Sequence, residues 1–324
     1  MHAVDPGLVA RFRADTDSLA GYSPERLGIA VSGGPDSLAL LLLAAAAYPG
    51  AVEAATMDHG LRATSVAEAA FVASVCRDLD LPHAILAPGW ERPPKVNVQA
   101  RARAARYEAL SEWAAARGLS HVATGHHLDD QAETLLLRLG RGSGVGGLTG
   151  IRPSSQAPGP VPIIRPLLQW SRTELREIVA AAGIEAVDDP SNADPAFDRT
   201  RARAMLAQHD WLAPSRLAAS AAAAAEADEA LEWTADQLFS QRGTQHEDGT
   251  VSIDPHHLPH ELQRRLLLRA LAHFTDWRNI PGPKLIRLLD ALLRGEAATL
   301  AGVRILPGPR WRLSPAPPRR DAPR

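Results

Sequence analysis

Short apolar runs alternate with longer amphipathic stretches over the first 140 residues. A short apolar run bounded by turn residues is typical of a buried strand, and apolar positions recurring every three or four residues predict a helix. We expect strands at 27–31, 52–57, 84–86 and 121–123, and helices at 37–48, 65–80, 98–117 and 128–139. This strict alternation predicts an α/β fold with a doubly wound parallel sheet, which binds ligands at the carboxyl ends of its strands.

The pattern changes in the second half of the chain. Glycine and proline dominate residues 141–162, which we expect to form a loop. Alanine-rich helical sequence begins at about residue 214, and further helices are predicted at 261–274 and 283–294. We therefore expect an α/β domain at 1–212, a smaller all-helical domain at 213–300, and a terminal segment at 301–324 that ends in a disordered proline-rich tail.

Composition excludes several classes of protein. The single cysteine, Cys76, allows neither an internal disulfide nor a cysteine-ligated metal cluster. No apolar run is long enough to span a membrane, and the N-terminal residues lack the apolar core of a signal peptide, so we expect a cytoplasmic protein without membrane contact. The formal net charge of −2 argues against a strongly basic nucleic-acid binder.

The turn SGGPDS at 32–37 joins the first predicted strand to the first predicted helix. A Walker A loop needs a lysine, and none lies within forty residues of Ser32; the Rossmann glycine pattern is also absent. Adjacent glycines and a helix N-terminus still favour a phosphate, and an aspartate beside phosphates calls for a cation such as Mg²⁺. The predicted pyrophosphate-binding residues are Ser32, Gly33, Gly34, Pro35, Asp36 and Ser37.

A second pair of carboxylates follows the fourth predicted strand in HVATGHHLDDQAET. A parallel sheet would bring Asp129 and Asp130 close to the SGGPDS turn, so Asp36 and one of the pair, Asp130 in our assignment, could share the Mg²⁺. The other aspartate could instead cap the helix. Zinc is disfavoured at His126 and His127, because adjacent histidines point in different directions and no third spaced ligand follows.

Longer motifs point to a known family. The glycine turn resembles that of the PP-loop ATP pyrophosphatases, which cleave ATP between its α and β phosphates. The stretch GHHLDDQAETLLLRLGRGSGVGGLTG resembles the corresponding motif of the tRNA(Ile)-lysidine synthetases. Other segments that match this family in order are MDHGLR at 57–62, ARAARY at 102–107, IRPLL at 164–168 and DDPSNADPAFDRTRAR at 188–203.

The resemblance implies a two-step reaction. These enzymes use ATP and Mg²⁺ to adenylate oxygen 2 of the wobble cytidine in the CAU anticodon of tRNA(Ile), and free L-lysine then displaces AMP. It implies catalytic roles for Asp36, Asp129, Asp130, Arg103 and Arg106. It further implies ATP contacts at Met57, His59 and Gly125, and tRNA or lysine contacts at Asn192, Asp194, Arg199, Arg201 and Arg203.

Two departures from the family pattern are visible. Thr200 stands where the family usually has an asparagine, and only LAGVRILPGPRWRLSPAP could be a remnant of the second C-terminal domain of longer relatives, so a short form is expected. Alternatives are another PP-loop tRNA-modifying enzyme or an inactive RNA-binding relative. A thiolase of the same superfamily is disfavoured by the single cysteine, and the retained aspartates argue against an inactive copy. The oligomeric state, including a homodimer, stays open.

Overall fold

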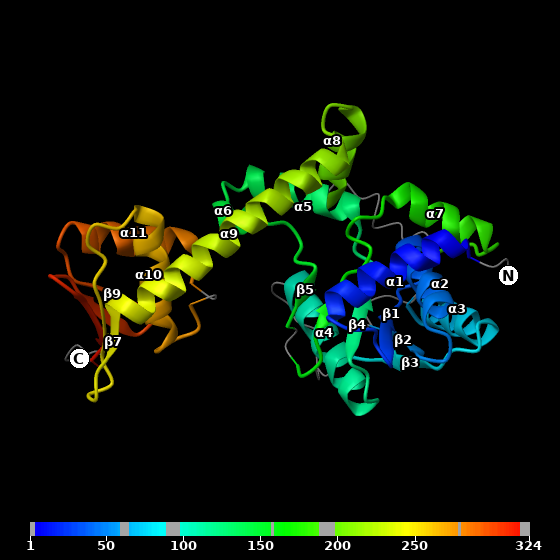
Figure 1. Ribbon diagram of the computed structural model, residues 1–324, viewed down its shortest axis with the longest axis horizontal. Helices are drawn as coiled ribbons and strands as arrows, with labels where there is room; N and C mark the ends of the chain where they lie inside the picture. Colours follow the sequence, from blue (N-terminus) through cyan, green and yellow to red (C-terminus); the bar gives the residue numbers. More distant parts are fainter. Residues whose placement is uncertain are drawn as a thin grey trace, which may run out of the picture. The chain divides into compact units, whose positions relative to one another are not determined.

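A computed structural model describes residues 4–58, 65–88, 98–156, 159–187, 198–277 and 280–317. The chain forms two compact units, Met1–Ala225 and Glu226–Arg324 (Figure 1). The division falls inside the 29-residue helix α9 (Pro214–Arg242), whereas the sequence places the boundary at residue 212. Within the described residues, no helix is long and apolar enough to cross a membrane.

The first unit is built on a six-stranded sheet in the order β3-β2-β1-β4-β6-β5. Its strands are β1 (Leu27–Ala30), β2 (Val52–Met57), β3 (His83–Leu86), β4 (His121–Thr124), β5 (Ser154–Ser155) and β6 (Ile163–Ile164). All neighbours pair in parallel except β5 with β6. Because β1 lies between β2 and β4, the direction in which strands are added reverses at β1, and this leaves a crevice at its carboxyl end.

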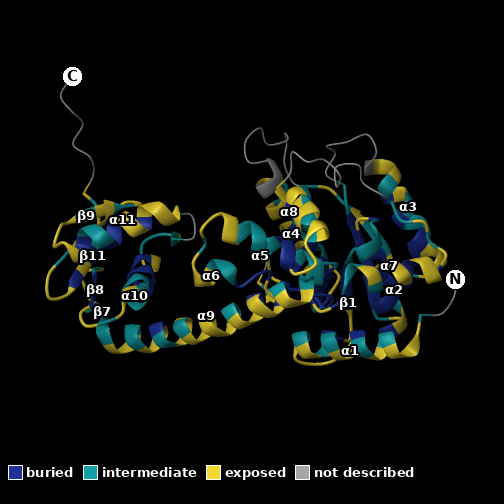
Figure 2. Ribbon diagram, turned by 90° about the horizontal axis from the view of Figure 1, so that it is seen from above, coloured by how far each residue is buried: buried dark blue, intermediate teal, exposed yellow. Residues whose placement is uncertain are grey.

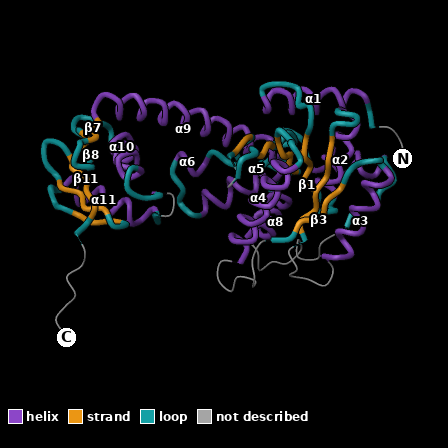
Figure 3. The backbone as a smooth tube through the Cα atoms, turned by 90° about the horizontal axis from the view of Figure 1, so that it is seen from below, coloured by secondary structure: helices purple, strands orange, loops and turns teal. Residues whose placement is uncertain are grey.

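Helices cover both faces of this sheet, which confirms the predicted doubly wound class. The helices of the unit are α1 (Pro6–Ala20), α2 (Pro35–Ala47), α3 (Ser65–Asp78), α4 (Val98–Ala116), α5 (Leu128–Gly140), α6 (Val145–Leu148), α7 (Arg172–Ala181) and α8 (Asp198–Gln208). Side chains of α1, α2, α3 and α7 share one core with β1 and β2, and side chains of α4 share a second core with β4 and β6. The backbones of α2 and α3 lie on one side of the strands and that of α4 on the other (Figures 1 and 3). Helix α2 is buried along nearly its whole length (Figure 2).

The second unit differs from the all-helical domain that the sequence predicts. Helices α10 (His260–Ala272) and α11 (Gly282–Leu293) are present, but a five-stranded antiparallel sheet in the order β7-β8-β11-β10-β9 accompanies them. Its strands are β7 (Gly243–Gln245), β8 (Val251–Ile253), β9 (Ala298–Leu300), β10 (Val303–Leu306) and β11 (Trp311–Pro315). The terminal segment thus contributes two strands, and residues 318–324 of the predicted tail lie outside the described residues.

The sequence pattern does not predict this sheet, because its strands are only three to five residues long. Alternation is nevertheless present: Val303 and Ile305 face inward from β10, and Trp311 and Leu313 face inward from β11. These side chains pack in one core with the apolar sides of α10 and α11. The helices alone would leave this apolar surface exposed, so the strands complete the unit.

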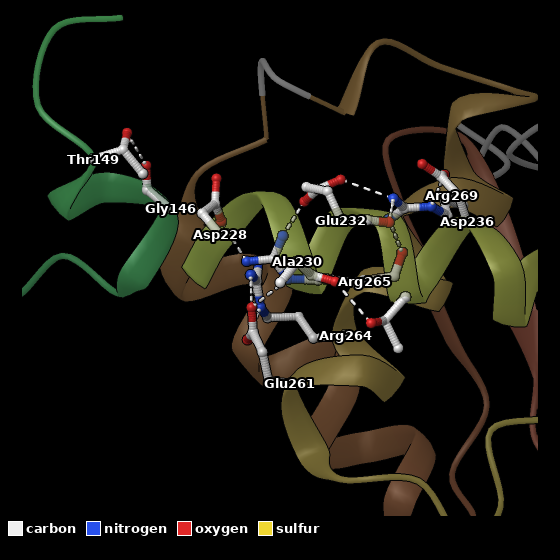
Figure 4. Close-up of polar contacts among 11 residues, drawn as sticks. Gly146, Thr149, Asp228, Ala230, Glu232, Asp236, Glu261, Arg264, Arg265 and Arg269 are labelled. Atoms are coloured by element: carbon white, nitrogen blue, oxygen red, sulfur yellow. Dashed lines mark hydrogen bonds and ion pairs between the residues drawn. The ribbon is translucent and has the colours of Figure 1, made fainter. Parts of the chain in front are cut away.

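A buried guanidinium joins α10 to the C-terminal half of α9 in the second unit. Arg265 is 1% exposed and donates to Asp228 at 2.6 Å, to Glu261 at 2.8 Å and to Glu232 (Figure 4). Arg269 extends the network to Glu232 and Asp236. Since a buried charge is tolerated only when it is paired, this network fixes how the two helices pack.

Replacing Arg265 with methionine should therefore destabilise the second unit by about 3–5 kcal/mol, because the buried Asp228 would lose its ion pair with Arg265. The control is Arg294→Met, which removes an exposed ion pair with Glu296 and should change little. Urea unfolding of both variants measures the difference. Equal stability of the two would show that the network contributes nothing.

The end of β4 approaches the first turn of α2 too closely for a side chain. A Cβ atom added at Gly125 would lie 3.1 Å from backbone atoms of Asp36 and Ser37. Neither neighbour is a flexible side chain, so the glycine turn itself would have to shift. Gly125 thus sets how closely these two segments pack.

Gly125→Ala should cost about 1–3 kcal/mol of stability through overpacking, and it should also weaken ATP binding because it displaces the turn. Gly140→Ala is the matched control, since no atom lies within 4 Å of its added Cβ at the end of α5. Thermal unfolding and ATP titration test both variants. Unchanged ATP affinity in Gly125→Ala would contradict this account of the turn.

Candidate nucleotide-binding site

A cavity of about 410 Å³ opens at the carboxyl ends of the central strands. The last residues of β1 and β2 and the residues after β4 line it, together with the glycine turn and side chains from α3, α4, α5 and α8. This is the position at which the strand order reverses, where open α/β sheets bind their ligands.

The glycine turn forms one wall of the cavity. Gly33 has φ +87°, a left-handed conformation that favours glycine. The Ser37 hydroxyl closes the turn, donating to the Gly34 carbonyl at 2.9 Å and accepting the N–H of Ser32 at 3.1 Å. Because α2 begins without a side-chain cap, its first N–H groups remain available for an anion.

Three carboxylates surround one buried imidazole beside this turn. The Nε2 atom of His127 lies 3.3 Å from Asp36 Oδ2 and 3.6 Å from Asp130 Oδ2, and its Nδ1 atom lies 3.5 Å from Asp129 Oδ2. His127 is fully buried, whereas the side chains of Asp36 and Asp130 are 31% and 15% exposed. The imidazole thereby connects the first turn of α2 to the first turn of α5.

The charge of His127 depends on these neighbours. Burial by itself lowers its pKa, but hydrogen bonding to Asp129 and Asp36 and the charges of Asp130 and Asp36 outweigh burial and raise the pKa to about 10. In the neutral ring, Nδ1 instead accepts the backbone N–H of Asp129 at 3.2 Å and caps α5. A protonated His127 offsets part of the negative charge that three close carboxylates would otherwise build up.

The two adjacent aspartates have different surroundings. Asp130 lines the cavity, and burial raises its pKa while His127 opposes that effect. Asp129 does not line the cavity; it accepts the backbone N–H of Arg172 at 2.9 Å, at the start of α7. Burial raises the pKa of Asp129, but the hydrogen bonds from His127 and Arg172 prevail and lower it to about 2. Asp129 therefore joins α5 to α7, and Asp130 faces the ligand space.

The cavity also has positively charged side chains in its lining. Arg103 and Arg106 from α4 and Arg199 from α8 line it, and no carboxylate of the described residues lies within ion-pair distance of any of them. Burial and these arginines keep the pKa of His126 well below its ordinary value, so that ring is neutral. Carboxylates and guanidiniums in the lining of one cavity suit a phosphate chain that also carries a cation.

Glu133 connects three helices behind the cavity. It is 1% exposed and accepts from Arg203 at 2.9 Å and from Arg172 at 3.2 Å, which ties α8 and α7 to α5. Arg203 therefore has a partner inside the protein. Arg201 has a 74% exposed side chain and only a 4.0 Å approach to Asp198.

Most of the predicted site residues meet at the cavity. Those that line it are Ser32, Gly34, Asp36, Ser37, Met57, Arg103, Arg106, Gly125, Asp130 and Arg199. Gly33 and Pro35 belong to the same turn without lining the cavity, and Asp129, Arg201 and Arg203 lie as described above. The predicted residues His59, Asn192 and Asp194 lie outside the described residues.

Sequence reasoning missed the residues that organise the site. It weighed His127 only as a zinc ligand, and it passed over Glu133, Tyr107 and Arg165, although all four stand inside the quoted motifs. The residues that flank these four in the sequence do not indicate that the four side chains are buried. In the described part of the chain, no group of three or more His, Cys, Asp or Glu side chains is arranged to hold a metal by itself.

The fold and site define a PP-loop domain, and comparison with known proteins agrees. The PP-loop domain family matches residues 9–210. The solved U34-tRNA thiolase NcsA from Methanococcus maripaludis, with its [4Fe-4S] cluster, is similar with a TM-score of 0.57. That likeness covers 69% of this chain and 80% of the thiolase at 16% identity, and it shows the fold alone.

Curated relatives narrow the assignment. The tRNA(Ile)-lysidine synthase of Novosphingobium aromaticivorans is 46% identical over 97% of this chain and 96% of its own length. The enzymes of Zymomonas mobilis and Ruegeria pomeroyi are each 42% identical, over 92% and 91% of this chain and 90% and 71% of their own lengths. The chain belongs to the tRNA(Ile)-lysidine synthase family.

Asp129 and Asp130 have different surroundings, so we expect their substitutions to have different effects on activity. Asp36→Asn and Asp130→Asn should abolish turnover, because each removes a charged oxygen from the cavity wall. Asp129→Asn should lower activity by only about tenfold, since the amide oxygen can still accept the Arg172 N–H. Steady-state kinetics on the purified variants measures these effects.

Circular dichroism and thermal unfolding verify that each of the three variants is folded. If Asp129→Asn is as inactive as Asp130→Asn while remaining folded, the separation of roles is wrong. Full activity in Asp36→Asn or Asp130→Asn would remove that residue from the reacting centre.

Proposed function

We propose that this protein ligates L-lysine to the wobble cytidine of the CAU anticodon of tRNA(Ile), forming lysidine through an adenylated cytidine. The observation that carries the proposal is the cavity at the strand-order reversal, which is lined both by carboxylates and by arginines that form no ion pair within the described residues. Membership of the family supports the choice of tRNA and amino acid. The reaction forms a carbon–nitrogen bond at the expense of ATP, and its substrates place it in the cytoplasm.

The residues present fit a magnesium ion that ATP brings with it. Asp36 Oδ1 is buried and has no hydrogen-bond partner among the described residues, and Asp130 approaches the same Nε2 atom of His127 as Asp36 does. Mg²⁺ is commonly held by one or two carboxylates, with phosphates and water completing its shell. When bound, it would neutralise phosphate charge and hold the triphosphate in place.

In the first step, oxygen 2 of the cytosine attacks the α-phosphorus of ATP, and the bond from that phosphorus to the bridging oxygen of the β-phosphate breaks. Pyrophosphate leaves with the bonding electrons. The N-terminal N–H groups of α2 and the glycine turn support the phosphates from one side. Arg103, Arg106 and Arg199 face the cavity where they can stabilise the negative charge that moves onto the leaving group.

In the second step, the side-chain amine of lysine attacks carbon 2 of the activated ring. The carbon–oxygen bond to AMP breaks, AMP leaves with the bonding electrons, and the proton lost by the attacking nitrogen passes to solvent. Glu68 from α3 also lines the cavity and offers a carboxylate that can hold the lysine ammonium before reaction. Asp194, predicted for this role from sequence, stays a prediction.

Incorporation of radiolabelled lysine into a tRNA(Ile) transcript with a CAU anticodon tests the proposal. Purified protein with ATP and Mg²⁺ should label this transcript and leave the methionine tRNA with the same anticodon unlabelled. Asp130→Asn should label neither.

The other outcomes discriminate among related reactions. Release of pyrophosphate that depends on tRNA, without retention of lysine, would keep the adenylation step and reject lysine as the nucleophile. Neither label nor pyrophosphate from a folded protein would overturn the assignment and favour an inactive RNA-binding relative.

A further inference from the structure

Three arginines converge on one buried tyrosine. Tyr107 on α4 is 8% exposed. The guanidinium carbons of Arg103, Arg106 and Arg165 lie 5.0, 5.3 and 6.0 Å from the centroid of its ring. Each distance is within the range of a cation–π contact. The ring thus contacts both α4 arginines of the cavity wall and one more that lies after β6.

Neutral oxygens hold the third arginine. Arg165 is 5% exposed and donates to the Arg152 carbonyl at 2.8 Å and to the Ser155 hydroxyl at 3.1 Å. Across the ranges that the structure describes, no carboxylate forms an ion pair with Arg103, Arg106 or Arg165. Two other arginines of this chain pair with carboxylates, Arg203 with Glu133 and Arg265 with Asp228. Arg138, in contrast, donates to the carbonyls of Gly147 and Gly150.

The difference has a physical consequence. A carboxylate beside an arginine cancels its charge, whereas an aromatic ring attracts a cation through its quadrupole and carries no net charge. Three guanidiniums held by a ring repel each other and keep their attraction for an anion. Burial and the nearby Arg106, Arg199 and Arg165 accordingly lower the pKa of Arg103, although Tyr107 opposes them.

The ring of Tyr107 lies within cation–π distance of all three guanidiniums. Burial raises the pKa of the Tyr107 hydroxyl, but the charges of Arg103, Arg106 and Arg165 prevail and lower it. The hydroxyl oxygen is buried and has no hydrogen-bond partner within the described part of the chain. Tyr107 does not line the cavity, so it acts on a ligand only through the arginines. Phenylalanine would preserve the ring, and leucine would fill much of the space without one.

We propose that Tyr107 is a positioning residue whose ring holds Arg103, Arg106 and Arg165 without neutralising them, so that the charge of Arg103 and Arg106, which line the cavity, is available to the pyrophosphate group of ATP. The inference rests on the proposed function for the identity of the anion. The ring takes the place that a carboxylate has beside Arg203 and Arg265.

Calorimetric binding of inorganic pyrophosphate, with kcat and KM for ATP measured alongside, tests the proposal. Tyr107→Leu should weaken pyrophosphate binding about tenfold and lower kcat/KM by a similar factor, because loss of the ring frees the guanidiniums. Tyr107→Phe should stay close to the wild type in both measurements. If Tyr107 acted through its hydroxyl, Tyr107→Phe would lose pyrophosphate affinity as Tyr107→Leu does.

A second series guards against a leucine variant that fails to fold. Phenylalanine analogues with one, two and three ring fluorines, introduced at position 107, weaken the ring quadrupole stepwise with little change in volume. Pyrophosphate affinity should fall with each added fluorine. A flat series would overturn the proposal, as would a folded Tyr107→Leu that binds like the wild type or a Tyr107→Phe that binds as weakly as Tyr107→Leu.

The binding measurement needs neither tRNA nor lysine. If the wild type binds pyrophosphate and responds to fluorination but makes no lysidine, the proposed function fails and the role of Tyr107 stands. If the wild type makes lysidine and pyrophosphate affinity does not change across the fluorine series, the proposed function stands and the role of Tyr107 fails.

Discussion

The buried contact of His127 with Asp36, Asp129 and Asp130 is the interaction on which the rest of the site depends. It joins the first turn of α2 to the first turn of α5, and the Asp129 carboxylate extends the connection to the N-terminus of α7. Two carboxylates are thereby held at the cavity, close enough to share one imidazole. Such concentrated negative charge is costly in a folded protein unless a cation compensates it. His127 compensates part of this charge, and one buried oxygen of Asp36 has no hydrogen-bond partner among the described residues.

Two arginines of the cavity are held in a different way from its carboxylates, by an aromatic ring and, within the described residues, not by ion pairs. Carboxylates fix Arg203 and Arg265, which hold helices together, whereas the ring of Tyr107 contacts Arg103 and Arg106, which line the cavity. This division separates structural charge from charge that is available for binding. The net charge of the chain is close to zero, but net charge says little about a single cavity. Arginines that have no carboxylate partner in the described part of the chain can therefore attract a polyanionic substrate to this one.

Sequence patterns predicted the first four strands and the glycine turn of the first unit well, because each of these signals is local. The four expected strands match β1 to β4 within a residue, and the glycine turn lies where strand and helix order required it. Long-range packing was not predictable in this way. Nothing beside Glu133 in the sequence reveals that Arg203 and Arg172 converge on it, and the short strands of the second unit become a sheet only through pairing between distant segments. The residue-level roles in tRNA and lysine binding remain predictions.

The central claim is that the cavity directs reaction to the α-phosphorus of ATP. The most direct measurement separates the products formed from ATP labelled in its α-phosphate, in the presence of Mg²⁺, tRNA(Ile) and lysine. The account predicts labelled AMP, with one pyrophosphate released for each lysine incorporated. Labelled ADP with free phosphate would show cleavage between the β and γ phosphates and would contradict it.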